Sequence, residues 1–331
     1  MKIRKSAAVL ATVGVILLAC DAIFYFGALP AFDKLPGNLD ITMNYEGHAS
    51  MLNSEALAAG DVAHAMLENL PITVQRRMYI SSTTSDTAIY HEESTIAGLN
   101  GLTLKGTHVY AVDRHSLGRA TAPSDATVEE HSGLTVAFPI DPPADDSLQL
   151  WDAYTQKPTP AKYLGSDTIS GRDVKRYVMT TEGPLADPAL LQSLPPVLPK
   201  AVVELMLPVL SVESRNALET SLPAAGDMLP ITYRSSGKLT LGVDTQLGSP
   251  VDGAQQQTIT AVAQVGDRAI DLLPMMVTDV KITEDSRNSA VDTVRSAGRK
   301  LTLVTIVAPL VLGFIGIVLV LGGLVINRRR K

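Results

Sequence analysis

The stretch Leu301–Ile326 reads LTLVTIVAPLVLGFIGIVLVLGGLVI and contains no charged residue. It is followed by the basic tail Asn327-Arg328-Arg329-Arg330-Lys331. At about 1.5 Å rise per residue, a helix of this length spans more than the ~30 Å hydrocarbon core of a bilayer. A buried helix of a soluble protein rarely runs this far without a polar face. We therefore predict that residues 298–331 form a C-terminal transmembrane helix with a basic cytoplasmic tail.

A second apolar stretch follows the basic residues of Met1–Lys5 and runs over Ala7–Phe32. Three interpretations fit it: a cleaved signal peptide, an uncleaved signal anchor, or a lipoprotein signal. In the third, Leu17–Cys20 would be the recognition motif, and Cys20 would carry the lipid. The apolar run continues through Ile23–Phe26, whereas the apolar region of a cleaved signal is usually shorter. We therefore expect an uncleaved anchor over residues 1–32.

Basic residues precede the first apolar stretch, at Lys2–Lys5, and follow the second, at Arg328–Lys331. Cytoplasmic flanks of membrane helices are enriched in Lys and Arg. This pattern predicts a two-pass protein of the plasma membrane with both termini in the cytoplasm. The intervening domain, residues 33–297, is then extracytoplasmic.

Composition narrows the range of functions. The net charge of −6 argues against a nucleic-acid partner, because binding phosphates requires a basic surface. With one cysteine, the chain cannot form an intrachain disulfide.

The domain between the anchors has the pattern of a β protein. Leu39–Tyr45 alternates apolar and polar residues, and similar short runs recur with Gly, Asn and Pro between them. No regular helices separate these runs, which disfavours a parallel α/β fold. A Pro- and Leu-rich segment at about 184–230 interrupts the pattern, and its prolines predict two or three short helices. We expect a mainly β domain, an extended antiparallel sheet or a sandwich-like fold, with this segment as a helical insert.

The sequence contains no motif of a known catalytic or cofactor site. The six histidines lack metal-ligand spacing, and we find no nucleophile elbow, phosphate-binding loop or dinucleotide fingerprint. Acidic pairs beside His91 and His131 could bind a cation, although a solvated loop explains them better. We therefore expect no enzyme activity, no catalytic residues, no cofactor and no metal.

Two features are candidates for ligand binding. The insert is either a cap that completes the core or a flexible apolar lid over a lipid-sized cavity. As a lid, it would contact an acyl chain through Leu205, Met206, Leu207, Val209 and Leu210. Arg114, at the end of the apolar run Val109–Val112, forms a surface ion pair with Asp113 or donates to a ligand head group. On the lid interpretation, a charge at Met206 or Val209 abolishes lipid capture without unfolding the domain.

Several short motifs occur in an order that resembles the actinobacterial PorA-type family, found in mycobacteria, corynebacteria and rhodococci. They are Tyr45-Glu46-Gly47, Tyr110-Ala111-Val112-Asp113-Arg114, His131-Ser132-Gly133-Leu134, Phe138-Pro139, Trp151-Asp152, Tyr163-Leu164-Gly165 and Ile169-Ser170-Gly171. The resemblance covers nearly the whole chain and implies an N-terminal anchor, a β-rich outer domain and a C-terminal anchor. It provides no catalytic residues to carry over.

The resemblance implies a role in assembly or transport of envelope glycolipids, of the lipoglycan or trehalose mycolate type. Expected partners are membrane glycolipids and envelope lipid transporters. The family name also implies a porin, but aromatic residues make up only 5% of the chain, and a transmembrane β-barrel needs aromatic girdles. A channel would therefore require an oligomer. A scaffold role in envelope assembly is the third alternative.

Overall fold

The computed structural model describes residues 5–23, 34–98 and 103–328. The chain divides into a helical unit, residues 1–36 with 292–331, and a β unit, residues 37–291. We describe each unit separately.

The helical unit contains α1 (Lys5–Ile23) and α7 (Ala308–Arg328). Helix α7 continues from α6 (Glu284–Thr302) through a π-helical segment, η7 (Leu303–Val307). Among the residues searched, the helix Glu284–Ile326 is long and apolar enough to cross a membrane. The apolar part of α1, Thr12–Ala22, is shorter than a membrane span. The remainder of the expected N-terminal anchor, residues 24–32, lies outside the described residues, so the two-pass topology stays a prediction.

Helices α1 and α7 approach closely at two glycines. A Cβ atom added to Gly14 would lie 2.7 Å from the carbonyl oxygen of Gly316, and one added to Gly316 would lie 2.9 Å from Cγ of Leu18. Small residues allow such contact between helix backbones, as they do in membrane helix pairs.

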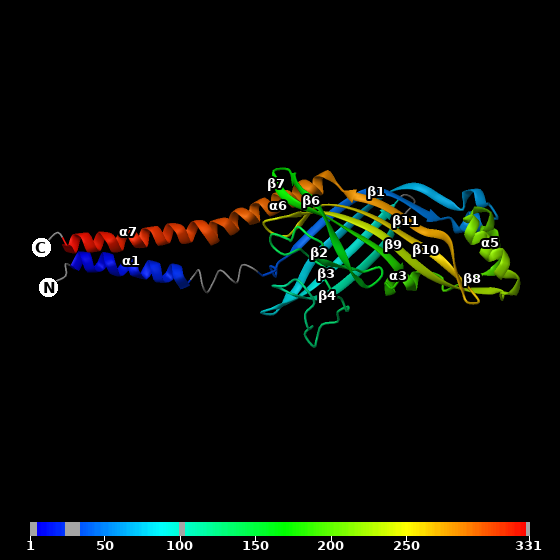
Figure 1. The fold of residues 1–331 in the computed structure, drawn as a ribbon, viewed down its shortest axis with the longest axis horizontal. Coiled ribbons are helices and arrows are strands. Elements are labelled where there is room, and N and C mark those ends of the chain that lie inside the picture. Colours follow the sequence, from blue (N-terminus) through cyan, green and yellow to red (C-terminus); the bar gives the residue numbers. More distant parts are fainter. Residues whose placement is uncertain (1–4, 24–33, 99–102, 329–331) are drawn as a thin grey trace. The chain divides into compact units, whose positions relative to one another are not determined.

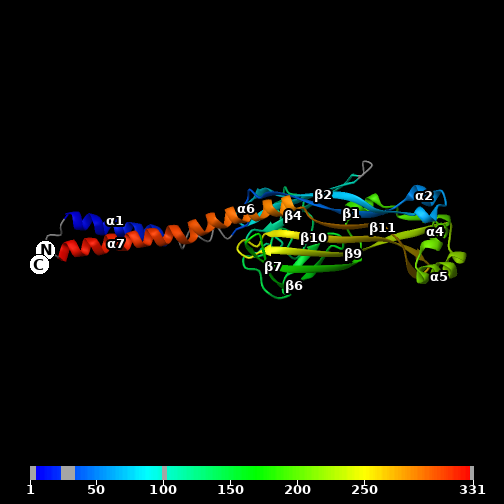
Figure 2. The same ribbon diagram turned by 90° about the horizontal axis from the view of Figure 1, so that it is seen from above.

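The β unit is built on one antiparallel sheet, which curls along its length (Figures 1 and 2). Its strands are β1 (Asp40–Leu52), β2 (Met66–Thr83), β3 (Thr87–Gly98), β4 (Thr103–Asp113), β5 (Gln149–Asp152), β6 (Lys157–Ile169), β7 (Arg172–Pro184), β9 (Met228–Asp244), β10 (Pro250–Val265) and β11 (Arg268–Ile282). Their order is β4-β3-β2-β1-β11-β10-β9-β7-β6-β5, and β8 (Val197–Pro199) pairs with β9. The expectation of a mainly β antiparallel domain is confirmed. The strands form one curled sheet instead of a sandwich, because each neighbour pairs edge to edge along the same path.

Buried and exposed residues alternate along the strands, which gives the sheet an inner and an outer face. On β1, Met43, Tyr45 and Ala49 are buried on the inner face, while Thr42 and Asn44 are exposed on the outer face. Successive side chains of a strand point to opposite faces, so residues paired across strands share a face. The register therefore assigns each side chain to a face, and burial of the apolar inner residues favours the curl.

The insert between β7 and β9 packs at one end of the sheet. It comprises α3 (Pro188–Ser193), β8, α4 (Lys200–Met206), η5 (Leu207–Val209), α5 (Val212–Ser221) and η6 (Leu222–Ala224). Asp187 caps α3 by accepting from the backbone N–H groups of Ala189 and Leu190, and Ser211 caps α5. The expectation of short helices is confirmed, since Pro208 ends the α-helical run after Met206. Two further short helices, α2 (Ser54–Ala58) and η3 (Val62–His64), lie between β1 and β2.

Residues 114–148, which we call the strap, connect the two edge strands β4 and β5. On the β4 side, the N–H of Glu129 donates to the carbonyl of Val109 at 2.7 Å. On the β5 side, the N–H of Leu134 donates to the carbonyl of Gln149 at 2.8 Å, and that of Trp151 to the carbonyl of Leu134 at 2.9 Å. One segment thus covers both sheet edges, which would otherwise expose unpaired backbone groups.

Candidate functional site

The inner face of the sheet carries charged side chains among apolar ones. In β2, Ile72, Val74, Arg76, Met78 and Ile80 occupy the inner positions. The charged residues Arg76 and Glu92 each keep 23% of their side-chain surface accessible. Because the register places both on the inner face, this surface faces the space inside the curl. We define the inner polar cluster as Arg76, Tyr90, Glu92, His108 and Gln255.

Arg76 is the centre of this cluster. Its Nε lies 3.1 Å from Oε1 of Glu92 on the neighbouring strand β3, and its Nη2 donates to Oε1 of Gln255 on β10 at 2.9 Å. Its guanidinium lies 5.6 Å from the centre of the Tyr45 ring. Tyr90 donates to Oε2 of Glu92 at 3.4 Å. Contacts between β2, β3 and β10 thus converge on one guanidinium group.

Burial governs the electrostatics of the cluster. Burial acts to lower the pKa of Arg76, but Glu92 together with Tyr45, Tyr154 and Tyr90 outweighs it and raises that pKa, so the guanidinium stays charged. Burial raises the pKa of the Tyr45, Tyr90 and Tyr154 hydroxyls, which therefore stay neutral hydrogen-bonding groups.

His108, on β4, extends the cluster toward the strap. Its Nδ1 lies 3.0 Å from Oε2 of Glu129 in the strap, and its Nε2 lies 3.8 Å from Oδ2 of Asp187, at the start of the insert. Burial acts to lower the pKa of His108, but the hydrogen bond and charge of Glu129, with Glu92 and Asp187, raise it above its ordinary value. The imidazolium form is therefore favoured between these carboxylates.

Apolar side chains surround the cluster without being completely covered. They are the partly buried Met78, Ile96, Leu104, Leu239 and Leu241, which come from β2, β3, β4 and β9. All share the inner face with Arg76 by register. The inner face therefore combines apolar and polar accessible surface.

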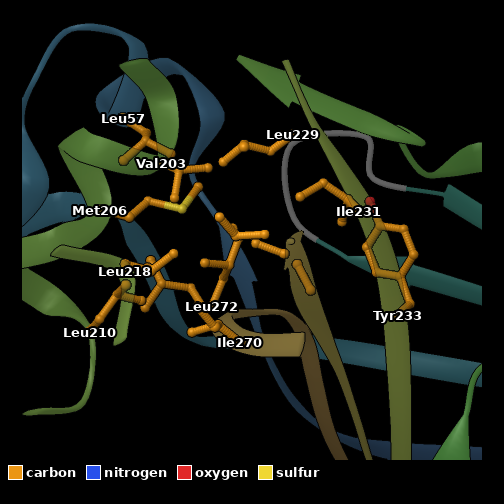
Figure 3. Close-up of a cluster of buried hydrophobic side chains, with 14 of the residues drawn as sticks. Leu57, Val203, Met206, Leu210, Leu218, Leu229, Ile231, Tyr233, Ile270 and Leu272 are labelled. Carbon is orange, nitrogen blue, oxygen red and sulfur yellow. The ribbon is translucent and has the colours of Figure 1, made fainter. Parts of the chain in front are cut away.

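The insert forms a well-packed hydrophobic cluster with the end of the sheet (Figure 3). Met206 and Leu210 are 2% and 5% exposed, and they point toward Val203, Leu218 and Leu272. Leu207 is partly buried against the same cluster. In contrast, Leu205 and Val209 each expose 39% of their surface. The five expected acyl-contact residues therefore lie on two sides of the insert, and in this conformation Met206 and Leu210 contribute to the core.

Arg114 is distant from the insert. Leu104, near the beginning of β4, packs against the insert cluster, whereas Arg114 follows the other end of this strand. Ten residues of strand separate positions 104 and 114, roughly 30 Å. Nη1 of Arg114 donates to the carbonyl of Thr84 at 3.0 Å, and Asp113 accepts from the N–H of Ser116 at 2.7 Å. The structure does not bring Arg114 and the insert residues into one site.

The motifs that suggested the family meet mainly around the strap. The His131 ring lies 5.1 Å from the Tyr110 ring and 6.4 Å from the Trp151 ring, measured between ring centres. Gly133 adopts φ +84°, and a Cβ there would lie 2.7 Å from the carbonyl oxygen of Gln149. These motif residues therefore attach the strap to β4 and β5.

The acidic pair beside His91 is divided between the two faces of the sheet. Glu92 faces inward, while Glu93 on the outer face accepts from the Tyr79 hydroxyl at 3.0 Å. Across the part of the chain that the structure describes, no group of three His, Cys, Asp or Glu residues could hold a metal ion. The sequence analysis did not identify the inner polar cluster, although Arg76 at an inner, partly buried position of the alternating β2 pattern was a detectable signal.

The curled antiparallel sheet defines a mainly β protein, and the long apolar C-terminal helix is of the kind found in membrane-associated proteins. A family model described as Porin PorA matches residues 6–325. The chain belongs to the Porin PorA family, which is not an enzyme family, and the resemblance seen in the motifs is confirmed.

Comparisons with curated proteins and with solved structures give no further information on function. No functionally curated protein matches the chain. Among solved structures, a MaoC-like dehydratase has 8% identity and a TM-score of 0.14, with 78% of this chain and 82% of that chain covered. An acyl-CoA thioesterase II, TesB2, from Mycobacterium marinum has 12% identity and a TM-score of 0.13, with coverages of 74% and 81%. TM-scores this low carry no argument about fold or function.

Proposed function

We propose that this protein binds glycolipids of the lipoglycan or mycolate type and helps their transport or assembly in the periplasm of an actinobacterium. Family membership and the long apolar C-terminal helix support a location in the cell envelope. The β unit would then be extracytoplasmic and both termini cytoplasmic, as the basic flanks predict. Membrane glycolipids are the proposed ligands, and envelope lipid transporters are the proposed protein partners.

The amphiphilic inner face of the curled sheet is the observation that carries this proposal. Accessible apolar side chains such as Leu239 and Leu241 offer a surface for an acyl chain. Each buried methylene is worth about 0.8 kcal/mol, so a partly enclosed chain outweighs any single polar contact. The polar cluster on the same face offers hydrogen bonds to a head group. Leu205 and Val209 of the insert expose further apolar surface.

Native mass spectrometry of the full chain, purified from its own host, tests the proposal by detecting co-purified lipid. We expect bound glycolipid in the wild type and its loss in the double variant Leu239→Gln/Leu241→Gln. Thr240→Gln is the matched control, because Thr240 lies between these residues on the opposite face of β9. A wild-type chain that carries no lipid and captures none from host extract would contradict the proposal and favour a scaffold role.

A channel formed by an oligomer is the second candidate, favoured by the family description. Reconstitution of the full chain into planar bilayers tests it. Stepwise conductance that depends on protein concentration would support a channel.

A further inference from the structure

We propose that the inner polar cluster binds an uncharged, hydroxyl-rich head group, a sugar or polyol attached to its acyl chain without a phosphate. This inference rests on the proposed function and specifies the ligand class of the same inner face. It concerns Arg76, Tyr90, Glu92, His108 and Gln255, of which the sequence analysis considered only Glu92, as part of an acidic pair.

The balance of charges facing the inside disfavours an anionic head group. Arg76 is already paired with Glu92 at 3.1 Å. His108 is flanked by Glu129 at 3.0 Å and Asp187 at 3.8 Å. Even with His108 protonated, the three carboxylates of Glu92, Glu129 and Asp187 outnumber the two cations, Arg76 and His108. A phosphate or carboxylate would add negative charge to a partly desolvated space, where an unpaired charge is costly.

The hydrogen-bonding groups of the cluster suit hydroxyl groups. Glu92 supplies acceptors, Arg76 supplies donors, and Gln255 supplies both. A sugar hydroxyl can donate to a carboxylate and accept from a guanidinium at once, and bonds to charged groups are stronger than neutral ones. Nε of Arg76 is buried beside Glu92, so the part of the Arg76 side chain that stays accessible is what a head group would contact.

Accessibility also favours this position for a head group. Arg76 and Glu92 keep 23% of their side-chain surface and His108 keeps 16%. Ile96 shares the inner face of β3 with Glu92, and its cross-strand partner Leu104 shares that of β4 with His108, so apolar surface continues from the polar cluster toward one end of these strands. A single-chain amphiphile can therefore contact both kinds of surface along one strand direction.

Competition between two probes with the same alkyl chain tests the inference. Full-length protein held in amphipol is mixed with equimolar dodecyl maltoside and dodecyl phosphate, and native mass spectrometry measures the ratio bound. We expect the wild type to prefer the maltoside at least tenfold. Preference for the phosphate would overturn the inference and leave the proposed function intact. Binding of neither probe would count against the proposed function itself.

Two variants test whether the preference for the maltoside depends on the inner polar cluster. Glu92→Gln leaves Arg76 without its carboxylate and should shift the ratio toward the phosphate at least tenfold. Glu93→Gln is the matched control, because Glu93 is adjacent in sequence but lies on the outer face. An equal shift in both variants, or an unchanged ratio in a folded Glu92→Gln protein, would overturn the assignment to this cluster. The wild-type competition decides the ligand class even if Glu92→Gln fails to fold.

Discussion

Nε2 of His131 donates a hydrogen bond to the backbone carbonyl of Ala111 at 3.0 Å. The histidine belongs to the strap and the alanine to β4, so this bond holds the strap against one edge of the sheet. The same ring packs edge-on against Tyr110 of β4 and Trp151 of β5. A single side chain, 3% exposed, therefore contacts both edge strands. His131 therefore links the strap to both edge strands.

Replacing His131 should weaken the β unit. His131→Ala removes the hydrogen bond to Ala111 and leaves a cavity between Tyr110 and Trp151, and we expect a loss of about 2–4 kcal/mol in the free energy of unfolding. Urea denaturation followed by tryptophan fluorescence measures it, since Trp151 is the one tryptophan. The control, His115→Ala, changes a histidine with 45% of its side chain exposed and should cost less than about 0.5 kcal/mol. Equal stabilities of the two variants would contradict this role of His131.

Gly133 should not tolerate a side chain. Its φ of +84° is strained for other residues, and a Cβ would meet the Gln149 carbonyl oxygen at 2.7 Å. We expect Gly133→Ala to cost about 1–3 kcal/mol. Gly226→Ala is the control, because no atom lies within 4 Å of a Cβ there. Thermal unfolding of both proteins gives the comparison, and a wild-type melting temperature for Gly133→Ala would show that the strap rearranges easily.

The stability contributed by His108 should fall as the pH rises. Its pKa is raised in the folded state, so its contribution is fully present below the ordinary value of 6.5 and is lost as the pH rises through the folded-state pKa. The stability difference between wild type and His108→Gln should therefore shrink as the pH rises above about 6.5. Denaturation at a series of pH values measures it. In a Glu129→Gln background this pH dependence should be weaker, and a difference that grows with pH would have the wrong sign for this environment.

Charged substitutions in the insert should have different effects on its two sides. Met206→Asp places a carboxylate in the hydrophobic cluster and should unfold the insert, contrary to the expectation from sequence that the domain tolerates it. Val209→Asp, at a 39% exposed position, should leave the fold intact. Limited proteolysis within residues 185–227 distinguishes the two. Protection of the Met206→Asp insert would show that this cluster can open without unfolding.

Helices α1 and α7 should be crosslinkable if the N-terminal helix is retained. A Cβ at Gly316 would lie 2.9 Å from Cγ of Leu18, which suits a disulfide between Leu18→Cys and Gly316→Cys in a Cys20→Ser background. After proteolysis in the β unit, the two terminal fragments should stay linked on a non-reducing gel. Leu18→Cys with Gly322→Cys is the control, because nothing lies within 4 Å of a Cβ at Gly322. An N-terminal fragment lacking residue 18 would instead indicate a cleaved signal.

Much of the fold followed from local patterns. Alternation in segments such as Leu39–Tyr45 predicts strands because the side-chain period of a strand is two residues. Prolines in the segment 184–230 predict short helices because proline lacks an N–H and clashes with the preceding turn. The uncharged stretch Leu301–Ile326 predicts a membrane helix from its length alone. Each of these inferences needs only neighbouring residues.

The candidate site depended on contacts between residues distant in the sequence. Arg76 and Gln255 are 179 residues apart, and their hydrogen bond exists only because β2 and β10 lie in the same curled sheet. Strand order decided that Glu92 faces Arg76, and the path of the strap decided that Glu129 reaches His108. The sequence by itself determined the β character of the domain, the short helices of the insert and the long apolar C-terminal helix, because short-range sterics and hydrophobicity govern them. The tertiary structure alone decided which charges share the inner face, because long-range strand pairing sets the register and the curl.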